Sequence, residues 1–142
     1  MESLHPLVVH FPIALLLTAV AVEGLALALK RPSLHRVSLW NLGLGTSGAA
    51  AAVLSGLLAE QAAKHSFEIW KVLELHERLG ITTLILGLVA TGVRLLRRDR
   101  LGPRLRLVAF LLMLGMVSSL VAGGYLGGRL VYELGVGGRF GR

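Results

Sequence analysis

Four long apolar stretches alternate with short polar segments along this chain of 142 residues. An α-helix needs roughly 20 mostly apolar residues to cross the hydrocarbon core of a bilayer, and each stretch is of about that length or longer. The predicted spans cover about 8–29, 37–62, 76–96 and 105–126. Because they occupy most of the chain, the pattern predicts a single four-span transmembrane domain over 1–142 and no separate soluble domain.

The connections between the predicted spans are short, which favours antiparallel packing of consecutive helices. Pro32 and Pro103 mark two of the turns, because proline stops a helix from continuing. Pro12 predicts either a helix start or a kink in the first span. We therefore expect an all-α, up-down-up-down four-helix bundle. The glycine pairs of segment 123–138 would break a helix, so this segment is expected to form a short capping element at the outer end.

Composition supports the membrane assignment. Charged residues make up 16% of the chain and the mean hydropathy is +0.71, whereas soluble domains usually contain about 25% charged residues. The absence of cysteine excludes disulfides, iron–sulfur clusters and thiolate metal sites. The net charge of +7 is carried by short loops, which indicates topology signals and contacts with anionic lipid headgroups, and not nucleic acid.

Basic residues are distributed unevenly between the two sides of the predicted bundle. The other side of the bundle carries six basic residues, whereas the first and third loops carry nine. These nine are Lys30, Arg31, Arg36, Arg94, Arg97, Arg98, Arg100, Arg104 and Arg106. The positive-inside rule therefore predicts cytoplasmic first and third loops and both termini outside. No basic residue precedes Lys30, so the first stretch is expected to be a span and not a cleaved signal peptide.

Small residues are frequent in the spans, for example Gly45, Gly48, Gly87 and Gly123. One interpretation is close helix–helix packing, because lipid-embedded helices associate through faces of small residues. The other is that glycine leaves space for a flat cofactor between helices. The two interpretations are compatible.

The five histidines include two that begin predicted spans, His10 in the first and His76 in the third. These two spans run in the same direction and can stand diagonally across a four-helix bundle. Diagonal axes would lie roughly 12–14 Å apart, since adjacent helices pack at about 8–10 Å. That gap suits an iron held by an imidazole on each side, so we predict a non-covalent b-type haem ligated by His10 and His76. His35 is expected to be a solvated loop residue.

The same residues also suit ligands other than haem. His5 is a supporting or alternative ligand, and the outer histidines with nearby glutamates could hold zinc or copper. A further interpretation is that these histidines lie at the membrane interface and bind no ligand. Arg78 and Arg129 are candidates for pairing with haem propionates, against an interpretation as interfacial snorkelling charges. Glu23, the one acid well inside a span, is interpreted as a structural ion pair with Arg94 or Arg106 in preference to a proton relay.

Three segments carry a resemblance to a known family: HPLVVHFPIALL at the N-terminus, LHERLG before the third span, and GGYLGGRLVYELGVGG near the C-terminus. The chain resembles the bacterial membrane proteins of the domain-of-unknown-function 2231 family, which show an HPxxVHFPIA start and a GGxLVYxxGVG ending. The resemblance implies four spans, a bacterial inner-membrane location, and motif positions for His5, His10 and His76. Leu134 stands where relatives often have histidine. Some relatives occur with Rieske or cytochrome-type modules, which implies electron transfer.

The leading functional hypothesis is a small membrane cytochrome b that transfers electrons rather than catalysing a reaction. A Rieske or cytochrome-type protein, or quinone, would be its redox partner, and a homo-oligomer is compatible with the small-residue faces. The alternatives are a non-haem metal-binding protein and a structural subunit of a larger membrane complex.

Overall fold

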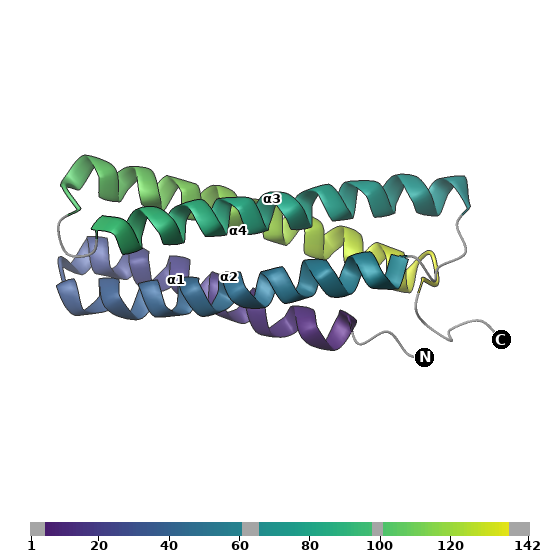
Figure 1. Cartoon of the computed structure of the whole chain (residues 1–142), viewed down its shortest axis with the longest axis horizontal. Helices are drawn as coiled ribbons and strands as arrows, with labels where there is room; N and C mark the ends of the chain where they lie inside the picture. Colours follow the sequence, from purple (N-terminus) through teal and green to yellow (C-terminus); the bar gives the residue numbers. More distant parts are fainter. Residues whose placement is uncertain (1–4, 61–65, 98–100, 137–142) are drawn as a thin grey trace.

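Four α-helices make up the structure, a computed structural model that describes residues 5–60, 66–97 and 101–136 (Figure 1). All four are long and apolar enough to cross a membrane, which confirms the predicted all-α, four-span fold. In chain order the helices are α1 (His5–Leu29), α2 (Pro32–Glu60), α3 (Phe67–Arg97) and α4 (Pro103–Tyr132).

The helices run up and down as two hairpins laid on each other, α1 with α2 and α3 with α4 (Figure 1). Contacts also join α2 to α3 and α1 to α4, whereas within the described residues α1 does not pack against α3, nor α2 against α4. These two pairs are therefore the diagonals of the bundle, as predicted for α1 and α3. We call the end that holds the α1–α2 turn the Glu23 end, and the opposite end the His76 end.

The α1–α2 turn is very tight. Lys30 adopts a left-handed backbone conformation with φ of 51°, and the Arg31 amide donates to the Ala26 carbonyl at 3.1 Å. Pro32 then occupies the first position of α2, where its missing N–H costs nothing because that group has no partner within the helix. Pro103 begins α4 in the same way.

Several helix boundaries differ from the predicted ones. Helix α2 begins at Pro32, so 33–36 are helical and do not form a loop. Helix α3 begins at Phe67, nine residues before His76. Pro12 lies inside α1, which begins at His5, so of the two alternatives predicted for Pro12 the helix start is wrong. The polar residues within 33–36 and 67–75, which suggested loops, are thus helical residues at the ends of the bundle.

The glycine pairs near the C-terminus do not break α4, contrary to expectation; the helix continues to Tyr132. A glycine costs about 1 kcal/mol in a helix interior, whereas an unsatisfied backbone group in lipid costs several. A turn follows the helix, closed by the Val136 amide donating to the Leu130 carbonyl at 2.8 Å. Gly135 adopts φ of 68° in this turn. Residues 137–142 lie outside the described residues.

Small side chains allow close approach of the helices around a narrow core. A Cβ added to Gly45 would lie 2.7 Å from Leu16 Cδ2, and one added to Gly87 would lie 2.8 Å from Thr46 Oγ1. The close-packing interpretation is therefore confirmed at these positions. Large apolar side chains face outward, as expected for a lipid-facing surface. The buried core cluster consists of Leu16, Ala19, Leu42, Ala49, Ala90, Met113 and Met116.

Candidate functional site

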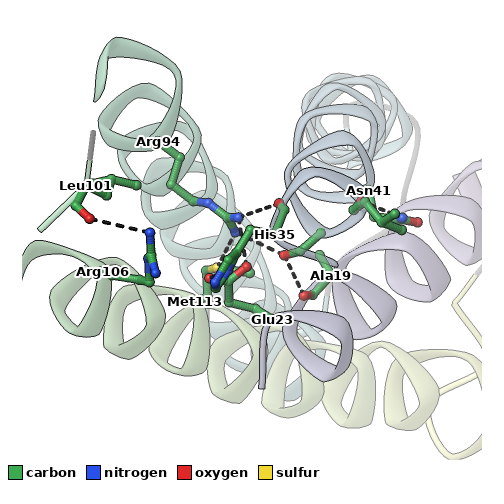
Figure 2. Close-up of polar contacts among 10 residues, drawn as sticks. Ala19, Glu23, His35, Asn41, Arg94, Leu101, Arg106 and Met113 are labelled. Atoms are coloured by element: carbon green, nitrogen blue, oxygen red, sulfur yellow. Dashed lines mark hydrogen bonds and ion pairs between the residues drawn. The ribbon is translucent and has the colours of Figure 1, made fainter. Parts of the chain in front are cut away.

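A polar cluster lies inside the bundle toward the Glu23 end, with contributions from all four helices (Figure 2). We call it the Glu23 network; it consists of Glu23 on α1, His35 and Ser38 on α2, Arg94 on α3 and Met113 on α4. Ionisable residues at membrane depth are costly, and those that occur are usually paired and functional.

Glu23 binds two partners with its two carboxylate oxygens. Oε2 forms an ion pair with Arg94 Nη2 at 2.7 Å, and Oε1 lies 2.8 Å from His35 Nδ1. The exposed fractions of the side chains are 3% for Glu23, 5% for Arg94 and 18% for His35. The Oε2 contact lacks hydrogen-bond geometry, so this oxygen is satisfied by charge alone among the described residues. The carboxylate is thus held by a cation on one side and an imidazole on the other.

The Arg94 guanidinium is held from several directions. Nη1 donates to Ser38 Oγ at 2.9 Å and approaches Met113 Sδ at 3.4 Å, while Nη2 donates to the His35 carbonyl at 2.8 Å. Ser38 Oγ in turn donates a hydrogen bond to the Ala19 carbonyl at 2.8 Å. A buried cation loses much solvation free energy, and this set of acceptors replaces the lost water.

The predicted Glu23–Arg94 pair is confirmed. Arg106, the alternative partner, donates instead to the Leu101 carbonyl at 3.4 Å. The prediction for His35 is wrong: it is a helical residue bound to Glu23 and not a solvated loop residue. The missed signal was Pro32, which permits a helix start and so places His35 in the first turn of α2, beside the returning end of α1.

A groove of about 1180 Å³ opens beside the Glu23 network, chiefly between α2 and α3. Along α2 its lining runs from Pro32 to Ser47, and α3 contributes Thr91, Arg94 and Leu95. The lining is completed by Glu23, Leu101 and Arg106. Arg106 of α4 also borders a smaller cavity of about 150 Å³ next to His35. The network therefore adjoins open space on two sides.

At the opposite end, His76 is half-buried between α3 and α4. Its Nδ1 lies 2.8 Å from the Gly123 carbonyl oxygen, a contact in which Nδ1–H is the donor because the oxygen can only accept. A Cβ added to Gly127 would lie 3.0 Å from His76 Cε1, so the glycine leaves the space that the imidazole fills. The carbonyl orients the ring, and Nε2 is the ring nitrogen that this contact does not use.

Packing contacts fix the relative height of the helices at the His76 end. A Cβ added to Gly48 would lie 3.2 Å from Pro12 Cβ, and one added to Gly80 would lie 3.8 Å from Val53 Cγ2. Val53 follows Gly48 by five residues on α2. At 1.5 Å per residue, Gly80 is therefore about 7.5 Å closer to the His76 end than Pro12 is.

The same register separates the predicted histidine ligands. His76 lies one turn beyond Gly80, whereas His10 is only two residues beyond Pro12, which leaves His76 roughly 10 Å further out than His10. His5 is only about 3 Å from the level of His76. Figure 1 shows the cause: α3 extends further than α1 at this end. The sequence predicts a common depth for His10 and His76 only if the third helix begins at His76. It begins at Phe67 instead.

The other predicted site residues lie on the surface. His10 is exposed. Arg78 Nη2 donates to Glu74 Oε1 at 2.6 Å, and Arg129 Nε donates to Glu133 Oε2 at 2.7 Å. Each arginine thus pairs with a glutamate one turn away on its own chain segment.

No group of three or more histidine, aspartate or glutamate side chains suited to a metal ion occurs among the residues that the structure describes. His65 and the side chain of His5 lie outside that description. The described part of the bundle therefore gives the non-haem metal hypothesis no additional support.

Four apolar helices of membrane length, two of which are joined by a buried ion pair at one end, define the chain as a multi-pass integral membrane protein of the lipid bilayer. The chain belongs to the family described as predicted membrane protein (DUF2231), whose sequence model matches residues 1–139. No curated protein and no solved structure shows a significant match to the chain. The family assignment confirms the resemblance seen in the three sequence segments.

Proposed function

We propose that the protein is a membrane b-type cytochrome in which His76 is one axial ligand of the haem. The observation that carries the proposal is the contact between His76 Nδ1 and the Gly123 carbonyl at 2.8 Å. Metal-ligating histidines almost always donate their second ring N–H to a carbonyl or carboxylate, which orients the ring and raises its basicity. His76 has this arrangement, with the lone pair of Nε2 as the metal-binding electron pair.

The second ligand in this proposal is a histidine of α1. The register between the helices favours His5, which is close to the level of His76, over His10, which is roughly 10 Å deeper. Both residues belong to α1, the helix that stands diagonally across the bundle from α3. His10 serves as the ligand only if α1 slides outward by about two turns.

The surroundings of His76 suit a flat group with a polar edge. Gly124 and Gly128 have no atom within 4 Å of an added Cβ, so the α4 face near His76 has unfilled positions. Arg78 and Arg129 are two of the cations at this end, and either would exchange its glutamate partner for a propionate. Exposed ion pairs contribute at most about 1 kcal/mol, so this exchange costs little.

If two histidines held the haem iron, they would leave it no position for oxygen, and this would favour electron transfer over oxygen chemistry. We therefore expect an electron carrier and not a catalyst. Its redox partner would be a Rieske or cytochrome-type protein, or quinone, acting at the His76 end.

Absorption spectroscopy of the full chain, purified from haem-replete cells, tests the proposal. We expect a Soret band, sharper α and β bands after reduction, and about one haem per chain in a pyridine haemochrome assay. His76→Gly should lose these bands and regain them with added imidazole, which separates ligand loss from misfolding. His5→Ala should change the spectrum more than His10→Ala does.

A colourless protein from haem-replete cells overturns the proposal, as do bands that survive His76→Gly unchanged. Stoichiometric zinc or copper in a colourless preparation would favour the non-haem alternative. A colourless, metal-free protein that co-purifies in a larger complex would favour a structural subunit.

We also infer an inner-membrane orientation with the Glu23 end in the cytoplasm, because basic residues are concentrated there. The chain has no cysteine, so single-cysteine variants can be labelled without background. Gly102→Cys should resist a membrane-impermeant maleimide in intact spheroplasts, and Ser66→Cys should react. The reverse pattern would contradict the orientation.

A further inference from the structure

The groove between α2 and α3 is built from three kinds of side chain. Its lining includes cations, namely Arg36, Arg94 and Arg106; hydroxyl groups, namely Ser33, Ser47 and Thr91; and apolar side chains such as Leu39, Leu44 and Leu95. Its volume of about 1180 Å³ exceeds that of most small-molecule pockets, which measure about 300–1,000 Å³. Cations at one end of a groove that is otherwise lined by apolar and hydroxyl side chains complement a long ligand with an anionic head.

The charge balance in the groove is positive. Glu23 neutralises the deepest cation, Arg94, at 2.7 Å. Arg36 and Arg106 have no carboxylate within ion-pair distance among the described residues. Arg36 is exposed at the start of α2 and Arg106 is partly buried at the start of α4. Two uncompensated cations thus lie at the Glu23 end of the groove, where lipid headgroups would be found.

The groove has the length of one lipid leaflet. Along α2 it extends from Pro32 to Ser47, which corresponds to about 22 Å of helix. Half of a hydrocarbon core is about 15 Å thick, and the headgroup region lies beyond it. Trp40 lines the groove with 69% of its surface exposed, as expected for an aromatic residue near the membrane interface.

One position in the groove has no side chain to fill it. Gly43 lines it, and an added Cβ at Gly43 would have no atom within 4 Å. By contrast, Gly45 on the same helix packs tightly against Leu16. The open side of α2 therefore faces the groove, while its packed side faces α1.

We propose that this groove binds one anionic phospholipid, with the phosphate between Arg36 and Arg106 and an acyl chain along Gly43 and Leu95. The site is independent of the haem proposal, because it lies at the opposite end of the bundle. Arg94 contributes to the floor of the site, where its charge is already balanced by Glu23.

Native mass spectrometry of the delipidated full chain, titrated with phosphatidylglycerol or phosphatidylcholine, tests the proposal. We expect one tightly retained phosphatidylglycerol per chain and no comparable retention of phosphatidylcholine. The double variant Arg36→Gln/Arg106→Gln should bind about thirtyfold more weakly, because each basic residue near a membrane surface strengthens attachment about fivefold. A matched charge control is Arg36→Gln/Arg104→Gln, since Arg104 is exposed and does not line the groove; it should lose only about fivefold.

A second pair of variants tests the acyl-chain position without changing charge. Gly43→Leu should fill the groove and displace the lipid, whereas Gly92→Leu, which also meets no atom within 4 Å at Cβ but does not line the groove, should not. The helical signal in circular dichroism and the elution volume in size-exclusion chromatography should be unchanged in all variants. Equal retention of both lipids, or equal affinity of the two arginine double variants, would overturn the proposal, as would Gly43→Leu binding as tightly as Gly92→Leu.

Discussion

Glu23 of α1 and Arg94 of α3 form an ion pair at 2.7 Å, although their helices occupy diagonal corners of the bundle and do not otherwise pack together. The long arginine side chain crosses the centre of the bundle and donates to α2 on its way, at Ser38 and at the His35 carbonyl. One buried pair thus ties three helices together, and its loss should affect the whole bundle.

Removal of either partner should destabilise the protein strongly. We expect Arg94→Met and Glu23→Gln each to lower the free energy of unfolding by about 3 kcal/mol, because each leaves an uncompensated buried group. The double variant should lose clearly less than the sum, since no charge is then left unpaired. Unfolding in mixed micelles with increasing SDS measures these values. Strict additivity of the two losses would show that the pair is not coupled.

Gly45 and Gly43, two residues apart on α2, should respond oppositely to alanine. Gly45→Ala places a Cβ 2.7 Å from Leu16 Cδ2, and Leu16 is fully buried. Overpacking of this kind typically costs about 1–3 kcal/mol. Gly43→Ala meets no atom within 4 Å and should stabilise α2 by about 0.5 kcal/mol. The same SDS titration compares them, and equal effects would contradict the packing described for α1 and α2.

Lys30 is expected to be a suboptimal residue in the α1–α2 turn. Its φ of 51° is a left-handed conformation, which costs a residue with a Cβ about 1 kcal/mol and costs glycine almost nothing. Lys30→Gly should therefore raise the midpoint of thermal unfolding. Lys30→Ala removes the same charge without relieving the backbone, so it serves as the control. If both variants raise the midpoint of thermal unfolding equally, the removed charge and not the backbone conformation is the cause.

Gly127 should be required for the position of the His76 ring. A Cβ at Gly127 would lie 3.0 Å from His76 Cε1, so Gly127→Val should displace the imidazole from the Gly123 carbonyl. The ¹⁵N chemical shifts of His76 report the tautomer, and we expect the protonated-Nδ1 form to be lost. Gly128→Val, where an added Cβ meets no atom within 4 Å, should leave these shifts unchanged. This readout does not depend on bound haem.

The sequence by itself determined the number of spans, their antiparallel order and the family. Apolar runs of membrane length report helices directly, because in lipid every backbone group must find its partner within the segment. The Glu23–Arg94 pair was also predictable, since a carboxylate at membrane depth requires a cation and few were within reach.

The tertiary structure decided what local patterns could not. His35 is polar and follows a proline, a pattern typical of a loop, and only the tight turn at Lys30 brings it beside Glu23. The relative depth of His5, His10 and His76 depends on the register between helices, which small residues such as Gly48 and Gly80 set by contact with their neighbours. Hydropathy reports the distance of a residue from water but not its contacts within the bundle. The sequence therefore specified which segments enter the membrane, and packing between them specified which polar side chains meet.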